Sequence, residues 1–238
     1  MELRFTAIVI RKKEVGETDR LYTFYTREKG KVQSKGVGVR KPEAKLASSL
    51  ETLMLSDVAI VRTRGIGRIT GAITEETFPN LRSDLDTLLL ATESVRMFDR
   101  LIGLEEPDEE VFDLLREYLF LLDGLVESGE QERAALLAEG FFFQLASKLG
   151  YHLETGICAV SGEKLGSGKQ YAISPEAGGI ILAHNADQYA LAVSENVVKV
   201  LRLFFANRLA TFRKIRLSAA DMNQLSQARS VFFRYITR

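Results

Sequence analysis

Residues 5–37 of this chain read FTAIVIRKKEVGETDRLYTFYTREKGKVQSKGV, and this stretch decides the fold of the N-terminal part. Phe5–Arg11 is a β-branched run, and Leu21–Thr26 alternates aromatic residues with threonine. The sequence REKG at 27–30 is a turn signal, so Lys31–Val37 is predicted to pair with Leu21–Thr26 as a hairpin. Three strands are therefore expected in this stretch.

Two further strand-like runs follow at Ser56–Thr63 and Ile66–Glu75. Five short strands in about 75 residues are typical of a small barrel of the oligonucleotide/oligosaccharide-binding (OB) type, or alternatively of an SH3-like barrel. The segment between the third and fourth strands, VRKPEAKLASSLETL (39–53), is basic at its start and contains Pro42. It is predicted to form a flexible basic loop that leads into a short covering helix.

Helical periodicity takes over after the predicted barrel. Apolar residues recur at helical spacing at Leu81, Leu85, Leu88, Leu89, Val95 and Phe98. A second helix is expected to begin after Asp108, which is a typical N-cap residue. A third helix is expected from about Glu130 to Leu149, with Gly150 as its stop.

The last third of the chain begins with a Gly-rich segment, residues 151–192, with short extended runs at Gln170–Ile173 and Gly179–Leu182. Two helices are predicted after it, because Ser194 and Ser218 stand at N-cap positions ahead of helical patterns.

The charge is unevenly distributed, although 32 Lys+Arg balance 32 Asp+Glu. Residues 1–75 hold 15 basic and 9 acidic side chains (+6), residues 76–150 hold 6 and 17 (−11), and residues 151–238 hold 11 and 6 (+5). This asymmetry suggests different partners for different segments, and a basic first block can track a phosphate backbone. The alternative is that the blocks neutralise one another in the fold.

Composition excludes several classes of protein. A chain that is 46% hydrophobic and 27% charged is an ordinary globular protein. Its single cysteine excludes an internal disulfide framework and a zinc site made of four cysteines. No apolar run approaches the roughly 20 residues of a membrane span, and the first residues do not resemble a signal peptide. A cytoplasmic protein without membrane contact is expected.

Few residues point to catalysis. The sequence GSGKQ (166–170) resembles a phosphate loop, but Glu163 stands where the first glycine belongs, and Gln170 where Ser or Thr would bind magnesium. The candidate soft metal ligands are His152, Cys158 and His184, and their spacing fits no zinc-binding motif. Neither enzymatic activity nor a cofactor is expected.

The cations of the first block are the stronger functional signal. They lie on the predicted strands and the basic loop, at Arg11, Lys12, Lys13, Arg20, Arg27, Lys29, Lys31, Lys35, Arg40, Lys41 and Lys45. Tyr22, Phe24 and Tyr25 are interleaved, and single-strand binding needs cations for phosphates and rings for bases. Because neighbouring residues of a strand point to opposite faces, Tyr22 and Phe24 share one face and Tyr25 lies on the other, and one face must be core. Alternatively, these cations are solvated surface residues that contact no nucleic acid.

The chain resembles the RecO family of bacterial recombination mediators in several segments. These are AIVIRKKEVGETDRLYTFYTREKGKV (7–32), SKG (34–36) with the basic loop, FFFQLASKLGYHLETGIC (141–158), CAVSG (158–162) and ISPEAGG (173–179). The order and spacing of these segments, rather than any single motif, carry the resemblance, which covers residues 1–205.

The resemblance implies an α+β multidomain protein. An N-terminal five-stranded OB-fold barrel (1–78) would precede a helical domain (79–150 and 193–238) that is interrupted by a small zinc-finger-like insertion (151–192). It also implies a DNA repair and recombination protein that binds single- and double-stranded DNA and anneals complementary strands. The residues that match the family's DNA-binding positions are Arg11, Arg20, Lys35, Arg40, Lys41 and Lys45.

The resemblance further implies protein partners and no catalytic centre. Members of the family engage the acidic, aromatic-ended tail of single-stranded DNA-binding protein (SSB), and with RecR they help to load RecA in the RecF pathway. A nucleoid-associated location follows from that role. An SSB tail needs a basic rim and an apolar pocket, which are expected between the central and C-terminal helices near Phe141, Phe142, Leu145, Arg202 and Arg208.

The sequence departs from the family at the insertion. Many members carry Cys-x-x-Cys twice, but the first pair is Cys158 and Ser161 here, and the second falls on Leu182 and Asn185. Because leucine cannot coordinate a metal and three of the four thiolates are missing, no bound zinc is expected. The insertion is expected to be held by packing.

A second basic surface is expected in residues 196–238, which contain nine basic residues and one acid, Asp221. Two polyanions must meet during annealing, so a second basic surface fits that activity. Two other functions stay open from the sequence alone. One is a protein–protein adaptor whose barrel binds a peptide, and the other is a hydrolase or nuclease with an acidic site in residues 76–150.

Overall fold

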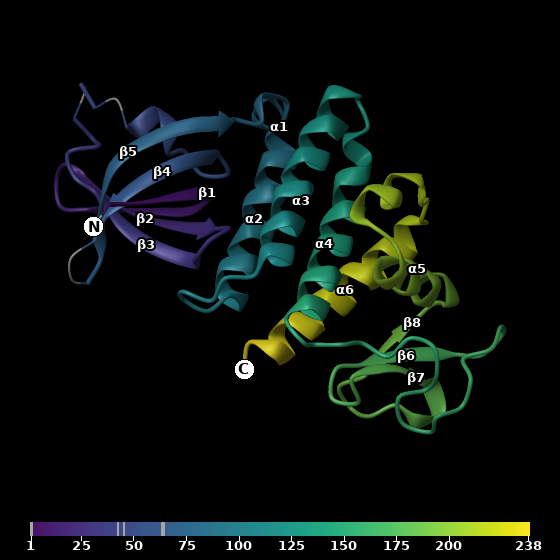
Figure 1. Cartoon of the computed structure of the whole chain (residues 1–238). Coiled ribbons are helices and arrows are strands. Elements are labelled where there is room, and N and C mark those ends of the chain that lie inside the picture. Colours follow the sequence, from purple (N-terminus) through teal and green to yellow (C-terminus); the bar gives the residue numbers. More distant parts are fainter. Residues whose placement is uncertain (1, 42, 45, 63–64) are drawn as a thin grey trace. The chain divides into compact units, whose positions relative to one another are not determined.

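The computed structural model describes residues 2–41, 43–44, 46–62 and 65–238. It divides into two compact units, Met1–Gln131 and Glu132–Arg238 (Figure 1). The domain boundaries expected from the sequence, after residues 78, 150 and 192, stay a prediction. Within the described residues, no helix is both long enough and apolar enough to cross a membrane.

The first unit begins with a closed barrel whose strand order is β1-β2-β3-β5-β4. Its strands are β1 (Glu2–Val15), β2 (Asp19–Thr26), β3 (Gly30–Gly36), β4 (Leu55–Val61) and β5 (Gly67–Glu76). The five predicted strands and the antiparallel β2–β3 and β4–β5 pairs are confirmed. The covering helix between β3 and β4 is a single 3-10 turn, Ala47–Ser49.

A short parallel contact between β3 and β5 closes the barrel. Ser34 registers with Gly67, and Lys35 registers with Arg68. Position 67 accepts only glycine without rearrangement, because a Cβ there would lie 2.5 Å from Ile60 Cγ2. The interior is filled by aromatic and β-branched side chains from all five strands, including Phe5, Val9, Tyr22, Phe24, Val32, Val58, Ile60 and Ile69.

Three helices complete the first unit: α1 (Pro79–Ser83), α2 (Leu85–Leu101) and α3 (Glu109–Glu127). Asp108 caps α3 as predicted, because its side chain accepts a hydrogen bond from Val111 N. The continuous apolar stripe predicted from Leu81 to Phe98 is wrong at Leu85 and Leu89, which are 68% and 58% exposed. Asp84 caps a new helix there, and α2 buries positions 87, 91, 94, 95 and 98, so Leu85 and Leu89 lie off the buried face.

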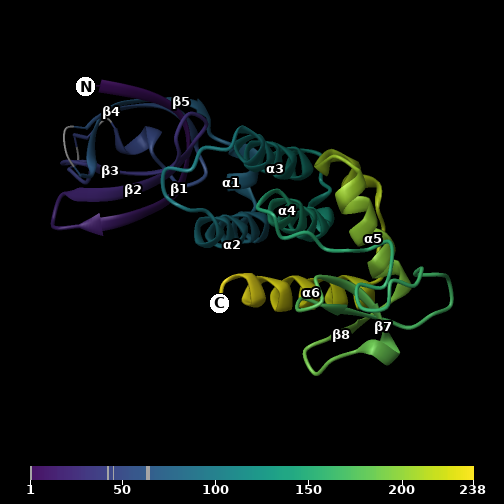
Figure 2. The same ribbon diagram turned by 60° about the horizontal axis from the view of Figure 1, so that its bottom comes forward.

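The second unit contains three helices and a small antiparallel sheet with strand order β7-β6-β8. The helices are α4 (Ala134–Lys148), α5 (Glu195–Ala206) and α6 (Ala219–Ile236), and the strands are β6 (Tyr171–Ser174), β7 (Gly179–Leu182) and β8 (Leu191–Val193). Ser194 and Ser218 cap α5 and α6 as predicted. The three-residue β8 was not predicted; it lies beside α6 (Figure 2), and Ser194 N after it donates to Gln224 Oε1.

Candidate nucleic-acid interface

Four of the predicted DNA-binding cations gather at one end of the barrel. The β2–β3 hairpin brings Arg20 opposite Gly36, next to Lys35. The chain then turns back, and Arg40 N donates to Thr18 O of the β1–β2 turn at 2.9 Å. Together with Lys12, the side chains at this place form what we call the basic end of the barrel: Lys12, Arg20, Lys35, Arg40 and Lys41.

Asp19 organises one side of the basic end. Its Oδ2 lies 2.8 Å from Lys35 Nζ, and its Oδ1 accepts a hydrogen bond from Gly38 N at 2.8 Å. The hydrogen bond from Lys35, followed by that from the Gly38 backbone, lowers the pKa of Asp19 to about 2. Asp19 is therefore ionised at neutral pH, and Lys35 is held in place by a carboxylate.

Two glutamates organise the other side of the basic end. Glu14 Oε1 lies 3.3 Å from Arg40 Nε and 4.0 Å from Arg20 Nη2. Glu51 lies 4.0 Å from Arg20 Nη1 and also forms an ion pair with Lys12. Four cations of the basic end thus carry intramolecular counterions, and a DNA phosphate would have to take the place of these carboxylates.

Two exposed cations, one in the basic end and one beside it, form no ion pair among the described residues. Lys41 lies in the turn after β3, and Arg68 lies on β5 in register with Lys35. Arg68 was not predicted as a neighbour of Lys35, because their proximity depends on barrel closure rather than on a local pattern. Lys45, which was predicted to bind DNA, lies outside the described residues.

Arg11 lies apart from the basic end and faces the helices of the same unit. Its Nε lies 3.3 Å from Asp99 Oδ2 on α2, and Lys31 Nζ lies 2.9 Å from Asp99 Oδ1. Two further ion pairs join the barrel to the acidic segment: Arg27 pairs with Asp113 on α3, and Lys29 pairs with Glu105 in the loop between α2 and α3. Part of the basic surplus of residues 1–75 is therefore neutralised by the acidic block, as the alternative interpretation of the charge pattern held.

The aromatic rings of β2 do not reach the surface of the barrel. Tyr22 and Phe24 are stacked in its interior, and Tyr25 packs edge-on against Phe98 with ring centroids 4.8 Å apart. All three side chains are at most 1% exposed. The hypothesis of a stacking platform on β2 is wrong, because one face of the strand fills the barrel and the other packs against helices. Every aromatic ring among the described barrel residues is buried, so this surface offers no ring on which a base could stack.

The residues predicted to form a pocket for the SSB tail are mostly core residues of the second unit. Phe141, Phe142 and Leu145 on α4 are each at most 2% exposed. Arg202 on α5 donates from Nε to Thr155 O at 2.6 Å, and Arg208 after α5 is exposed. The three apolar side chains are therefore buried, Arg202 is partly exposed and Arg208 is exposed.

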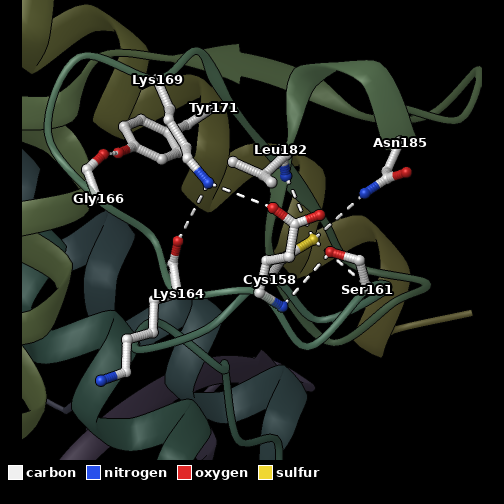
Figure 3. Close-up of polar contacts among 9 residues, drawn as sticks. Cys158, Ser161, Lys164, Gly166, Lys169, Tyr171, Leu182 and Asn185 are labelled. Carbon is white, nitrogen blue, oxygen red and sulfur yellow. Dashed lines mark hydrogen bonds and ion pairs between the residues drawn. The ribbon is translucent and has the colours of Figure 1, made fainter.

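The four positions of the family's two cysteine pairs converge on one sulfur atom (Figure 3). Cys158 Sγ accepts hydrogen bonds from Ser161 N at 3.5 Å, Leu182 N at 3.4 Å and Asn185 Nδ2 at 3.5 Å. Burial acts to raise the pKa of the Cys158 thiol, but the hydrogen bonds from Ser161 and from the backbone outweigh it and lower the pKa to about 6. A thiolate is therefore stabilised by N–H groups and a hydroxyl.

These residues do not fit a zinc ion, because Leu182 supplies no ligand atom and cysteine is present at one of the four positions. Among the described residues, no group of three or more His, Cys, Asp or Glu side chains is arranged to hold a metal ion. The absence of bound zinc stays a prediction for elemental analysis.

Comparison with known proteins gives the same family over nearly the whole chain. Residues 1–78 match the family model for the N-terminal part of recombination protein O, and residues 82–235 match the model for its C-terminal part. A DNA repair protein RecO from Dehalococcoides mccartyi (strain CBDB1) is 30% identical over 99% of this chain and 90% of its own length. Proteins of the same name from Desulfitobacterium hafniense (strain Y51) and Listeria monocytogenes are 28% and 25% identical, each over 95% of this chain and over 82% and 86% of their own lengths.

Proposed function

Because this chain belongs to the RecO family of DNA repair and recombination proteins, we propose that it is a DNA-binding recombination mediator that anneals single strands. It acts without a catalytic centre of its own: it binds DNA, brings complementary strands together and engages SSB. With RecR it then helps RecA to replace SSB on the strand. Membership of the family supports the proposed partners, and the cations of the barrel support the proposed DNA contact.

The observation that supports the DNA contact best is the basic end of the barrel. Arg20, Lys35 and Arg40 each lie 2.8–4.0 Å from a carboxylate oxygen, so their cationic groups are already placed to hold an anionic oxygen. A phosphate offers oxygens of the same charge, and charge-assisted hydrogen bonds to it are strong. Each phosphate that is neutralised also releases condensed counterions, which favours binding at low salt. Lys41, with Lys45 and Arg68, would extend the track of the backbone.

Contact through phosphates makes the barrel indifferent to base identity. Phosphate contacts position a nucleic acid but do not read its sequence, and the buried rings of the barrel leave no surface for stacking. Both single and double strands are therefore expected to bind the basic end. This tolerance suits a protein that has to hold a strand before and after pairing.

Annealing requires a second contact for the complementary strand, and the second unit supplies cations for it. Arg208, Lys214 and Arg216 are exposed on the segment between α5 and α6. The only acid in residues 196–238 is Asp221, whose carboxylate oxygens lie within hydrogen-bonding distance of Ser194 Oγ, Ser218 Oγ and Asn196 Nδ2. A second phosphate backbone would meet little repulsion there.

The SSB tail is proposed to bind the second unit at Arg202 and Arg208. Leu203 between them is 41% exposed, so an acidic segment with an aromatic end would find both charge and apolar surface at the end of α5. Phe141, Phe142 and Leu145 would support this surface from beneath rather than line it.

A strand-annealing assay tests the proposal. Complementary oligonucleotides are coated with SSB, and duplex formation is followed with and without this chain and with SSB that lacks its C-terminal tail. Faster annealing that depends on the tail is expected. If the chain leaves the annealing rate unchanged, the proposed function is wrong, and an affinity for oligonucleotides that does not respond to salt would favour a protein–protein adaptor instead.

A further inference from the structure

Two exposed tyrosines of the second unit flank one arginine. Tyr189, in the loop before β8, is 53% exposed, and Tyr235, in the last turn of α6, is 40% exposed. The Arg238 guanidinium carbon lies 6.0 Å from the centroid of each ring. We call these three side chains the Tyr–Arg–Tyr cluster.

Packing within the chain leaves both rings partly exposed, although Arg238 contacts each of them. Both rings are large apolar surfaces that face solvent, whereas every described ring of the barrel is buried. Arg234 lies in the last turn of α6, and Arg238 follows the helix, which ends at Ile236. The helix dipole favours cations at this end, but it gives no reason for exposed aromatic rings beside them.

The surroundings of the cluster are poor in acids that could satisfy the arginines internally. α6 has one acidic residue, Asp221, in its first turn, at the opposite end of the helix from Tyr235. Asp187, two residues before Tyr189, accepts hydrogen bonds from Ser174 Oγ and Tyr189 N, both at 2.7 Å. Its carboxylate therefore holds the loop that presents the ring.

We propose that the Tyr–Arg–Tyr cluster is a stacking platform for single-stranded DNA. Unpaired bases stack on the Tyr189 and Tyr235 rings, and Arg238 binds a backbone phosphate or stacks on a base through its planar guanidinium. Bases inside a duplex already stack on one another, so this platform holds single strands alone. The inference rests on the proposed function and adds a preference for unpaired bases, for which the barrel has no exposed ring.

The experiment compares three forms of the full chain: the wild type, Tyr189→Leu/Tyr235→Leu and Tyr189→Phe/Tyr235→Phe. Leucine keeps an apolar side chain but removes the π face, whereas phenylalanine keeps the ring. The probes are an oligo(dT) strand and a blunt duplex of the same length, measured at one salt concentration. We expect the leucine variant to bind oligo(dT) about tenfold or more weakly, in line with the loss of one or two base stacks. Duplex binding and the phenylalanine variant should match the wild type.

Each outcome separates this inference from the proposed function. If the leucine variant loses affinity for both probes equally, or if it binds oligo(dT) as the wild type does, the platform is refuted while DNA binding stands. Equal losses in the phenylalanine and leucine variants would also refute it, because the rings would then not be the cause. If the wild type binds neither probe, the proposed function fails, and this inference fails with it.

Discussion

Lys35 Nζ on β3 lies 2.8 Å from Asp19 Oδ2 on β2, so a cation proposed to hold DNA is paired with a carboxylate in the free protein. Asp19 also binds the Gly38 backbone, which ties the turn after β3 to the start of β2. The basic end is thereby held in one arrangement in the free protein. If DNA binds there as proposed, its affinity depends on how readily phosphates replace carboxylates, in addition to the number of cations.

Replacing the cations of the basic end should weaken DNA binding in a salt-dependent way. For Lys35→Ala/Arg40→Ala/Lys41→Ala, the slope of log K against log salt concentration should flatten by roughly 0.7–0.9 for each phosphate that the variant no longer neutralises. The measurement is a titration of a fluorescent oligonucleotide at several salt concentrations. Arg4→Ala is the control, since Arg4 is an exposed cation of the same barrel that lies near Asp57 rather than at the basic end. An unchanged slope in the triple variant would mean that DNA binds elsewhere.

Removing a competing carboxylate should have the opposite effect. Glu14 lies 3.3 Å from Arg40 and 4.0 Å from Arg20, so Glu14→Gln removes the carboxylate from Arg40 and leaves Arg20 with Glu51 alone. We expect DNA to bind about two- to fivefold more tightly, the size of one weak surface ion pair. Glu75→Gln removes the same charge from an exposed position of β5 and serves as the control. An equal gain in DNA affinity for both variants would show a general effect of net charge. It would argue against the replacement of the Glu14 carboxylate by a phosphate.

Local signals explain why so much of the fold could be predicted. The strands of the barrel and the N-caps at Asp108, Ser194 and Ser218 depend on short patterns that act within a few residues. The prediction of a continuous apolar stripe was wrong at Leu85 and Leu89, because Asp84 caps a new helix and the buried face shifts with it.

The site was harder to predict than the fold, because its geometry is set by contacts distant in sequence. Arg11 looked equivalent to Arg20 in the sequence, yet it pairs with Asp99 on a helix nearly 90 residues later. Lys35 and Arg68 become neighbours only when the barrel closes. Tyr22 and Tyr25 lie on opposite faces of β2, but the barrel interior buries the first face and the helices of the same unit bury the second.

The lone cysteine should titrate as an unusually acidic thiol. Because the pKa of Cys158 is lowered to about 6 from its usual value of 9.0, the ultraviolet absorbance of the thiolate should appear with a midpoint near pH 6. Chain stability is linked to this shift: the contribution of the thiolate is complete above about pH 9 and is lost as the pH falls through 6. The stability difference between the wild type and Cys158→Ser should therefore grow from pH 6 to pH 9.

The titration has one assignable source, since the chain has a single cysteine. Cys158→Ser should abolish the absorbance change, and Asn185→Leu, which removes the Nδ2 donor, should move the midpoint upward. A midpoint at the usual pKa of a free thiol would contradict the hydrogen-bonded thiolate.

A buried ion pair links α4 and α6. Arg229 Nε lies 3.0 Å from both carboxylate oxygens of Glu139, and the two side chains are 16% and 5% exposed. Glu139→Gln leaves a buried guanidinium without its counterion and should lower the free energy of unfolding by about 3–5 kcal/mol. Urea denaturation followed by far-ultraviolet circular dichroism measures this change.

The matched variant replaces both partners with apolar residues. Glu139→Leu/Arg229→Met should regain most of the stability that Glu139→Gln removes, because no buried charge is left alone. If the double variant is as unstable as the single one, the pair acts through packing rather than through charge.

The short contact between β3 and β5 makes the barrel weakest at one seam. β1 and β2 register over eight residue pairs, whereas the described residues of β3 and β5 register at two. Local opening begins where the fewest hydrogen bonds have to break, so β3 and β5 should separate transiently more often than the other strand pairs. Lys35 lies on β3 and Arg68 lies on β5, so a phosphate bound by both side chains would connect the two strands. A bound DNA strand would then keep β3 and β5 paired, and its release would allow them to separate again.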